Sequence, residues 1–235
     1  MKEGTTFPGQ EKSVETSSAT HDEIKIKSQD RTVVRRKKRG ANLNAKVLSR
    51  NEILAMIKNI PDKMGGFQNK GKMYKAMISL LYMTGARINE LLTLKKSQFE
   101  FTEDQETGMK YLVINNIPTL KRKVKFPRSQ FMRKDIEGNF IDFVKVWMNE
   151  LTSDDALLFP IKDSRAWQIV FKYTGMFPHY FRHVRNIDLV RLYGFNSFWL
   201  QRWNGWSKLQ SSESYVNLVG EDLKNKILEV KKKIG

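Results

Sequence analysis

The sequence of 235 residues contains no cysteine and only three histidines, His21, His179 and His183. Without thiols the chain can form neither a disulfide bond nor a cysteine-ligated metal site, and it has no thiolate nucleophile. Three histidines are too few to predict a zinc site. No apolar run approaches the ~20 residues of a membrane-spanning helix, and the N-terminus lacks the apolar segment of a secretory signal. We therefore expect a soluble, metal-free protein of the cell interior (cytoplasm or nucleoid) that is not secreted.

Acidic residues are scarce relative to basic ones. The chain has 42 lysines and arginines against 25 aspartates and glutamates, a formal net charge of +17. A field of that sign favours a polyanionic partner, and nucleic acid is the usual one. The same composition also fits a ribosome-associated or merely basic protein. A membrane-surface role is disfavoured because the basic residues are spread through globular-looking sequence.

The chain divides by composition into a tail and a folded domain. Residues 1–45 are mostly polar and predict a disordered tail, which carries a basic arm at residues 31–39 (RTVVRRKKR). Such runs are usually solvated. Here we favour an arm that lies along DNA phosphates, with a nuclear-targeting signal as the alternative. Residues 46–235 predict the folded domain.

Hydrophobic periodicity predicts mainly helices in this domain. A capping box at Ser49 and Glu52 begins the first helix, and Pro61 follows it. The patterns predict further helices at about residues 70–83, 86–94, 140–151, 164–173, 179–193, 198–204 and 223–233. Two apolar or alternating stretches, 111–114 (YLVI) and 121–126 (KRKVKF), predict a β-hairpin with one basic face. The expected fold class is α+β, mainly α-helical, with one small antiparallel sheet.

Two basic motifs are candidates for phosphate binding. In TGARINELL, Gly85 permits a sharp turn, so Arg87 begins a helix beside backbone amides, and Glu90 can orient it one turn later. In PHYFRH, His179 and Arg182 lie one helical turn apart and can reach one spot. A forked guanidinium binds two phosphate oxygens, and a nearby histidine can transfer a proton near neutral pH. Taken singly, each motif is also compatible with an ordinary surface helix.

Two aromatic residues near the C-terminal end complete the candidates. Tyr215 lies in SSESYVNL, which we interpret as a short polar stretch before the last helix. A free phenol is a poor nucleophile, but neighbouring arginines and a lysine would favour its phenolate. Trp206 follows Gly205, and its indole N–H can donate to a phosphate oxygen. A packing role is the default for either residue alone.

The order of these motifs resembles the tyrosine recombinase (phage integrase-like) family over roughly residues 48–218. TGARINELL is similar to the family's first motif, and PHYFRH followed by GW and Tyr215 is similar to its second. The resemblance implies that Arg87 and Arg182 clamp the scissile phosphate and that His179 assists proton transfer from the tyrosine. Tyr215 would then form a 3′-phosphotyrosyl link and release a 5′-hydroxyl. The resemblance also implies that a hairpin lysine protonates the leaving oxygen; our choice is Lys121, with Lys123 and Lys125 as alternatives.

Two features depart from the family pattern. Trp206 occupies the position at which most members have histidine, and some members also have tryptophan there. Typical members also have a helical core-binding domain of some 80–100 residues before the catalytic domain, whereas about 45 mostly polar residues precede it here. The chain therefore resembles a minimal or truncated integrase of the kind that viruses and plasmids carry.

The resemblance implies DNA integration and recombination without metal, ATP or another cofactor. The implied partners are double-stranded DNA and further copies of the chain in a dimer or tetramer, with no small-molecule substrate. One alternative is a type IB topoisomerase or resolvase-like enzyme, which shares the chemistry. The other is a catalytically idle DNA-binding protein derived from an integrase.

Overall fold

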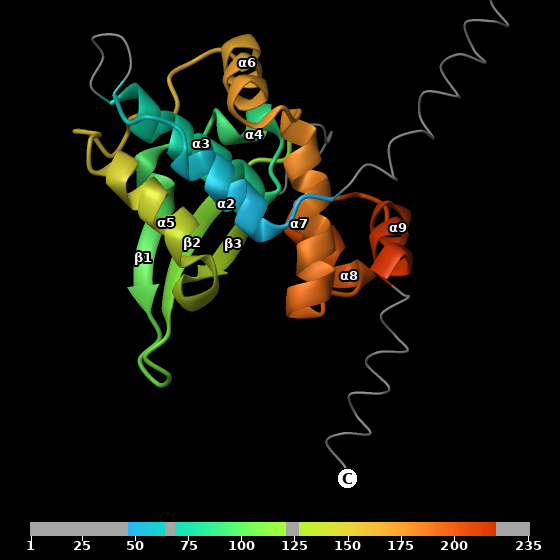
Figure 1. Ribbon diagram of the computed structural model, residues 1–235. Coiled ribbons are helices and arrows are strands. Elements are labelled where there is room, and N and C mark those ends of the chain that lie inside the picture. The colour runs from blue at the N-terminus through green and yellow to red at the C-terminus, as the bar shows by residue number, and fades with distance from the viewer. Residues whose placement is uncertain (1–46, 64–68, 121–126, 220–235) are drawn as a thin grey trace, which may run out of the picture. The chain divides into compact units, whose positions relative to one another are not determined.

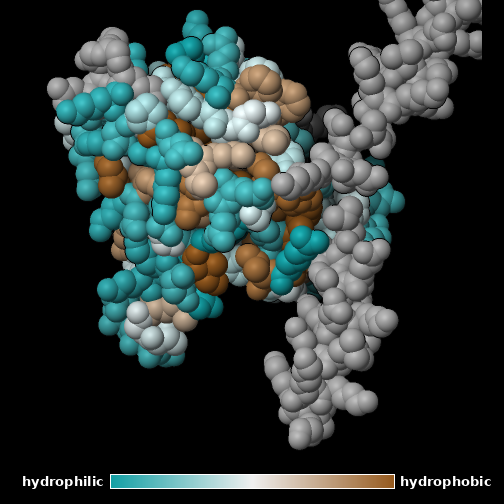
Figure 2. Space-filling model, in the orientation of Figure 1, coloured by the Kyte–Doolittle hydropathy of each residue, from teal (hydrophilic) through white to brown (hydrophobic). Residues whose placement is uncertain are grey.

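The computed structural model describes residues 47–219, apart from 64–68 and 121–126. The basic arm, the stretch with Lys121, Lys123 and Lys125, and the last expected helix (223–233) lie outside the described residues. The chain divides between Val47 and Leu48 into two units, and all described helices and strands belong to the second. On the face in Figure 2, hydrophilic residues cover most of the described surface, with small hydrophobic patches between them.

Helix α3 (Lys70–Thr84) is the centre of this unit. Its residues from Met73 to Thr84 are almost all buried, because apolar side chains occupy every face of the helix. Helices α5 (Lys134–Met148) and α7 (Pro178–Tyr193) pack against it (Figure 1). The helix ends as expected before Gly85, which has φ 59° and whose N–H donates to the Leu81 carbonyl.

The first predicted helix is confirmed as α2 (Arg50–Lys58). The Ser49 side chain accepts from the Glu52 N–H, and the Glu52 carboxylate accepts from the Ser49 N–H at 2.7 Å, which is the expected capping box. Ile53 and Ile57 form its buried face. The helix ends with a cap at Asn59, two residues before Pro61.

The sheet has three antiparallel strands in the order β1 (Phe99–Glu103), β2 (Lys110–Ile117) and β3 (Arg128–Arg133). The predicted strand at 111–114 is therefore confirmed, but the sheet has three strands where a two-stranded hairpin was expected. Strand β1 escaped prediction because it is a short edge strand with only its first residue buried, and its alternation is limited to Phe99 and Phe101. The partner of β2 on its other side is residues 128–133, whereas the predicted partner, residues 121–126, lies outside the described residues. Leu112 pairs with Met132, and both are fully buried beneath α5 (Figure 1).

The remaining helices are α4 (Ile88–Leu91), the 3-10 helix η1 (Lys96–Gln98), α6 (Asp163–Thr174), α8 (Ser197–Asn204) and α9 (Gln210–Val219), besides α5 and α7. Helices α4, α6 and α8 were expected, although α4 is shorter than the predicted 86–94, whereas η1 and α9 were not predicted. Helix α7 begins at Pro178 and ends before Gly194 at φ 66°, as expected. Helix α5 begins six residues earlier than predicted. Tyr215 lies on α9, whereas we expected only a short polar stretch before the last helix at this position. Helix α9 packs on α7 and α8 (Figure 1), and these contacts stabilise a helix that its polar sequence does not indicate.

Candidate active site

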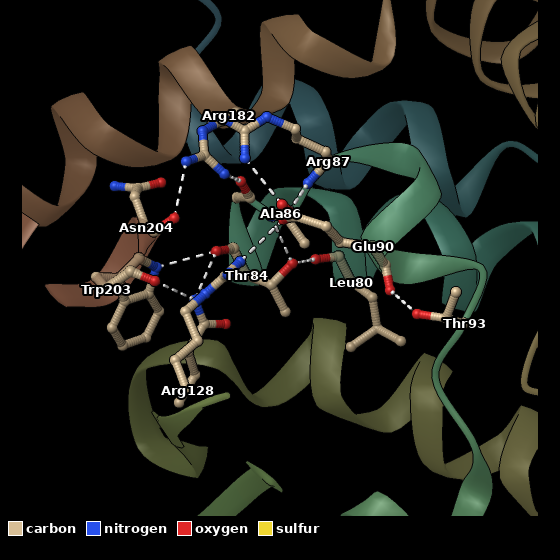
Figure 3. Close-up of polar contacts among 12 residues, drawn as sticks. Leu80, Thr84, Ala86, Arg87, Glu90, Thr93, Arg128, Arg182, Trp203 and Asn204 are labelled. Carbon is tan, nitrogen blue, oxygen red and sulfur yellow. Dashed lines mark hydrogen bonds and ion pairs between the residues drawn. The ribbon is translucent and has the colours of Figure 1, made fainter. Parts of the chain in front are cut away.

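Arg182 lies at the meeting point of three chain segments that are far apart in sequence. It projects from the second turn of α7, and only 2% of its surface is exposed. Its Nη1 donates to the Gly85 carbonyl at 2.7 Å and its Nη2 donates to the Asn204 carbonyl at 3.0 Å (Figure 3). The two carbonyls lie at the C-terminal ends of α3 and α8. Carbonyls at these positions have no hydrogen-bond donor within their own helix. The guanidinium therefore joins α3, α7 and α8 in one place.

A buried carboxylate holds two further arginines beside it. Glu90 is fully buried, accepts the Arg87 N–H at 3.1 Å and Arg87 Nη1 at 2.8 Å, and accepts Arg128 Nη2 at 3.1 Å. Burial alone would raise the pKa of Glu90, but the charge of Arg128 and hydrogen bonds from both arginines lower it. The expected orientation of Arg87 by Glu90 is thus present (Figure 3). Arg128, the first residue of β3, is a member of this cluster that the sequence did not indicate.

The cluster carries excess positive charge. Three guanidiniums (Arg87, Arg128 and Arg182) against one carboxylate (Glu90) give these four groups a net charge of +2. Burial and the charges of Arg87 and Arg128 together lower the pKa of Arg182 to about 9, whereas Glu90 and Tyr215 oppose the shift. A bound anion would relieve this repulsion. The cluster is therefore suited to an oxyanion such as phosphate.

Tyr215 is held against the same cluster by two rings. The Trp206 indole stacks on its phenol, with ring centroids 5.8 Å apart and planes 12° from parallel. The Arg182 guanidinium lies over the Trp206 ring, 5.3 Å from its centroid. The His183 imidazole packs against Tyr215 with a centroid distance of 5.3 Å and a tilt of 51°. Trp206 and His183, with Arg182 over the Trp206 ring, thus form a continuous group beside the phenol.

His179 lies in a cleft beside Arg87. It is exposed and lines a cleft of about 320 Å³ together with Arg87, Asn89, Trp167 and Phe177. The histidine that contacts Tyr215 is His183, which was not among the candidate site residues predicted from the sequence. Its signal was present, since His183 follows Arg182 directly and lies four residues after His179, on the same helical face.

Buried hydrogen bonds fix the segments that carry the cluster. The Thr84 carbonyl accepts Trp203 Nε1 and Gln130 Nε2, each at 3.0 Å, which links α3, α8 and β3 (Figure 3). The Asn204 amide donates to Asn186 Oδ1 at 2.7 Å, one turn beyond Arg182 on α7. These partners leave the backbone around Arg182 little freedom to move.

The structure brings four of the predicted residues, Arg87, Arg182, Trp206 and Tyr215, into this one cluster, with His179 in the adjoining cleft. The position of Lys121 lies outside the described residues. A second, wider groove of about 810 Å³ lies between β3 and α8 and is lined by Arg128, Arg202, Gly205 and Trp206, among others. Hollows therefore flank the arginine cluster on two sides. Within the described part of the chain, no group of three acidic or histidine side chains could hold a metal ion, and no helix could span a membrane.

The architecture is that of the catalytic domain of tyrosine recombinases. The XerH site-specific recombinase in a post-cleavage complex with a palindromic difH substrate is 21% identical, with a TM-score of 0.54 over 80% of this chain and 55% of that one. The XerA recombinase is 20% identical, with a TM-score of 0.52 over 77% of this chain and 64% of that one. The chain thus spans between half and two thirds of these recombinases. No protein-family model and no curated protein matches the sequence.

Proposed function

We propose that this chain is the catalytic domain of a site-specific DNA recombinase or integrase that acts through a covalent 3′-phosphotyrosyl intermediate. One observation carries the proposal: Arg87 and Arg128 pair with the buried carboxylate of Glu90 close to Arg182, and Arg182 contacts the indole that stacks on Tyr215. This arrangement supports a phosphate site beside Tyr215 as the proposed nucleophile. The fold, which is that of recombinases crystallised with their DNA substrates, supports the same conclusion.

The arginines bind the scissile phosphate. Arg87 is one-quarter exposed, so its guanidinium can reach a phosphate oxygen while one nitrogen stays paired with Glu90. Arg182 uses two nitrogens on backbone carbonyls, which fixes its plane and aims its charge at the bound phosphate. Donors that are held in place before the reaction stabilise the developing charge of a phosphorane without reorganisation. His179, beside Arg87 in the cleft, assists proton transfer from the tyrosine in this proposal.

Tyr215 is the nucleophile. Its oxygen attacks phosphorus, the bond to the 5′ oxygen breaks, and the strand end is stored as a 3′-phosphotyrosine. Because the energy of the broken bond is kept in this ester, a 5′-hydroxyl of another strand can reverse the step without ATP. Lys121 protonates the departing 5′ oxygen in this scheme, with Lys123 and Lys125 as the alternatives.

Duplex DNA and further copies of the chain are the proposed partners. The formal charge of +17 and the two hollows beside the cluster favour a long polyanion. Exchange of strands between two duplexes requires at least two active sites. Assembly of a dimer or tetramer on DNA therefore belongs to the proposal.

A covalent-trapping experiment tests this function. The purified chain is incubated with a randomised pool of duplexes that carry a nick, so that cleavage beside the nick releases a short fragment and traps the enzyme on the DNA. We expect a protein–DNA adduct that survives denaturant, and sequencing of the trapped DNA identifies the preferred site. The Tyr215→Phe variant is the matched control, because it keeps the ring that stacks on Trp206 and lacks the nucleophilic oxygen.

The outcomes separate the three candidate functions. An adduct with the wild type alone, followed by joining of strands from two different duplexes, supports a recombinase. An adduct followed only by resealing of one duplex supports a topoisomerase-like enzyme. DNA binding without any adduct contradicts the proposal and favours an idle DNA-binding protein.

A further inference from the structure

Three large aromatic side chains, Trp167 and Phe171 on α6 and Phe177 immediately before α7, form an exposed aromatic cluster. Their ring centroids lie 5.2 to 5.7 Å apart, and their planes are within 28° of parallel. Although the rings pack on one another, the three residues remain 41%, 43% and 54% exposed. Single exposed aromatic residues are common on protein surfaces, whereas a contiguous exposed apolar group marks an interaction site.

The aromatic cluster borders the same cleft as the proposed phosphate site. Helix α6 packs on α4, which follows Arg87, and on α7 (Figure 1). As a result, Trp167 and Phe177 line the cleft of about 320 Å³ together with Arg87 and His179. The cleft therefore presents a guanidinium and an imidazole beside flat apolar rings.

A nucleotide with an unpaired base has the two parts that match this lining, a phosphate and a flat ring. Proteins bind single-stranded nucleic acid in this way, with basic groups along the backbone and aromatic side chains on which the bases stack. A cleft of this size takes a group as large as one nucleotide. An apolar protein segment fits less well, because it would cover Arg87, whose side chain is one-quarter exposed, and supply no anion to the positively charged arginine cluster.

We propose that the aromatic cluster binds one unpaired base of the DNA, held outside the duplex next to the phosphate that Arg87 contacts; the inference rests on the proposed function. Trp167 and Phe177 line the cleft and contact the base, and Phe171 packs on both of their rings. A base inside a duplex cannot stack on them, because its neighbours cover its two faces. Stacking in the cleft offsets the free energy that is lost when the base leaves the duplex.

Binding of single-stranded oligonucleotides tests this base site without requiring cleavage. The full chain with Tyr215→Phe, the parent protein in this assay, is titrated with a fluorescent thymidine oligomer and with an abasic oligomer of the same length, which has the same phosphates and no bases. We expect the thymidine oligomer to bind roughly 5- to 150-fold more tightly, the contribution of one stacked base. Adding Trp167→Ala should remove most of this difference and leave the affinity for the abasic oligomer unchanged. Phe101→Ala is the matched control and should keep the full difference, because Phe101 is exposed on β1 and does not line the cleft.

Each result has a defined reading. Equal affinity of the parent for both oligomers, or an unchanged preference for thymidine in Trp167→Ala, overturns the inference. Unchanged binding of the abasic oligomer shows that Trp167→Ala is folded; if that variant does not fold, Phe177→Ala undergoes the same test and decides. If the rings instead hold another copy of the chain, Trp167→Ala lowers the oligomer mass in sedimentation and keeps the thymidine preference, which also overturns the inference.

The base site and the proposed function fail separately. Absence of a covalent adduct with the wild type sinks the proposed function, whatever the oligomers show. Equal affinity for the two oligomers in a protein whose wild type forms the adduct sinks only the base site.

Discussion

Gly205 lies against Thr119 so closely that a Cβ on the glycine would come within 2.4 Å of the threonine methyl carbon. The glycine ends α8 with φ 65°, and Thr119 is buried in the segment that follows β2. The same Cβ would lie 3.2 Å from Arg128 Nη1. The approach of these two segments therefore places α8 and Trp206 next to the arginine cluster, and it requires glycine.

Replacement of Gly205 by alanine should accordingly destabilise the fold and disturb the site. Left-handed backbone costs about 1–2 kcal/mol for a residue with a Cβ, and overlap with packed atoms adds about 1–3 kcal/mol. Gly194→Ala is the matched control, since Gly194 has φ 66° and nothing within 4 Å of an added Cβ. Urea denaturation should show a loss for Gly205→Ala that exceeds the loss for Gly194→Ala. Equal losses would mean that the contact with Thr119 relaxes without cost.

Substitution of Arg182 by lysine should abolish most cleavage while the charge is retained. One ammonium cannot reproduce donation to the Gly85 and Asn204 carbonyls together with contact to a phosphate. Loss of one fixed oxyanion donor reduces rates by roughly 100- to 1,000-fold. The rate of adduct formation at saturating DNA measures the effect, and Arg165→Lys serves as the control, because Arg165 is exposed on α6 and lines neither of the two hollows. Comparable rates for Arg182→Lys and the wild type would remove Arg182 from the mechanism.

Local signals in the sequence predicted the elements whose ends are chemically marked. The Ser49–Glu52 box and the glycines after Thr84 and Tyr193 fixed three helix boundaries, because these residues satisfy or terminate a helix by themselves. Strand β1 and helix α9 carried no such marks. Both depend on neighbours that a local pattern does not contain: β1 pairs with β2, and α9 packs on α7 and α8.

The residues of the candidate site likewise fall into those that the sequence predicted and those that it did not. Arg87, His179, Arg182, Trp206 and Tyr215 were proposed because their order resembles a family motif. Arg128 was missed, since its role comes from a contact with Glu90 that spans 38 residues. The contact between His183 and Tyr215 was also not predicted, because it depends on where α9 packs.

Removal of the Trp206 ring should slow cleavage by loosening Tyr215. In Trp206→Ala the phenol loses its stacked partner, a pair worth about 0.5–1.5 kcal/mol, and Arg182 loses the ring beneath its guanidinium. We expect adduct formation to fall by roughly 10-fold or more. Trp206→Phe, which keeps a ring but not the N–H, should fall between that variant and the wild type. Phe101→Ala is the control, because Phe101 is exposed on β1 and lines neither of the two hollows beside the cluster. A wild-type rate in Trp206→Ala would contradict a role for the stack.

The buried ion pair between Glu137 and Arg185 should make stability depend on pH. Glu137 is fully buried on α5 and accepts Arg185 Nη1 at 2.5 Å, Arg50 Nη1 at 2.7 Å and the Tyr193 hydroxyl at 2.9 Å. Burial would raise the pKa of Glu137, but the charges of Arg185 and Arg50 lower it below its ordinary 4.5. Its stabilisation is therefore complete above the unfolded pKa of 4.5 and is lost as pH falls through the lower folded value.

Glu137→Gln keeps the shape of the side chain and leaves Arg185 with an uncompensated buried charge. We expect it to lower the free energy of unfolding at neutral pH by about 3–5 kcal/mol. The exposed Asp142, which pairs with Lys134 on the same helix, provides the control, and Asp142→Asn should change stability by less than about 1 kcal/mol. Urea denaturation from neutral to strongly acidic pH should show the gap between wild type and Glu137→Gln shrinking in acid, because the wild-type carboxylate becomes protonated there. A gap that is constant over this range would show that the charge of Glu137 contributes nothing beyond its shape.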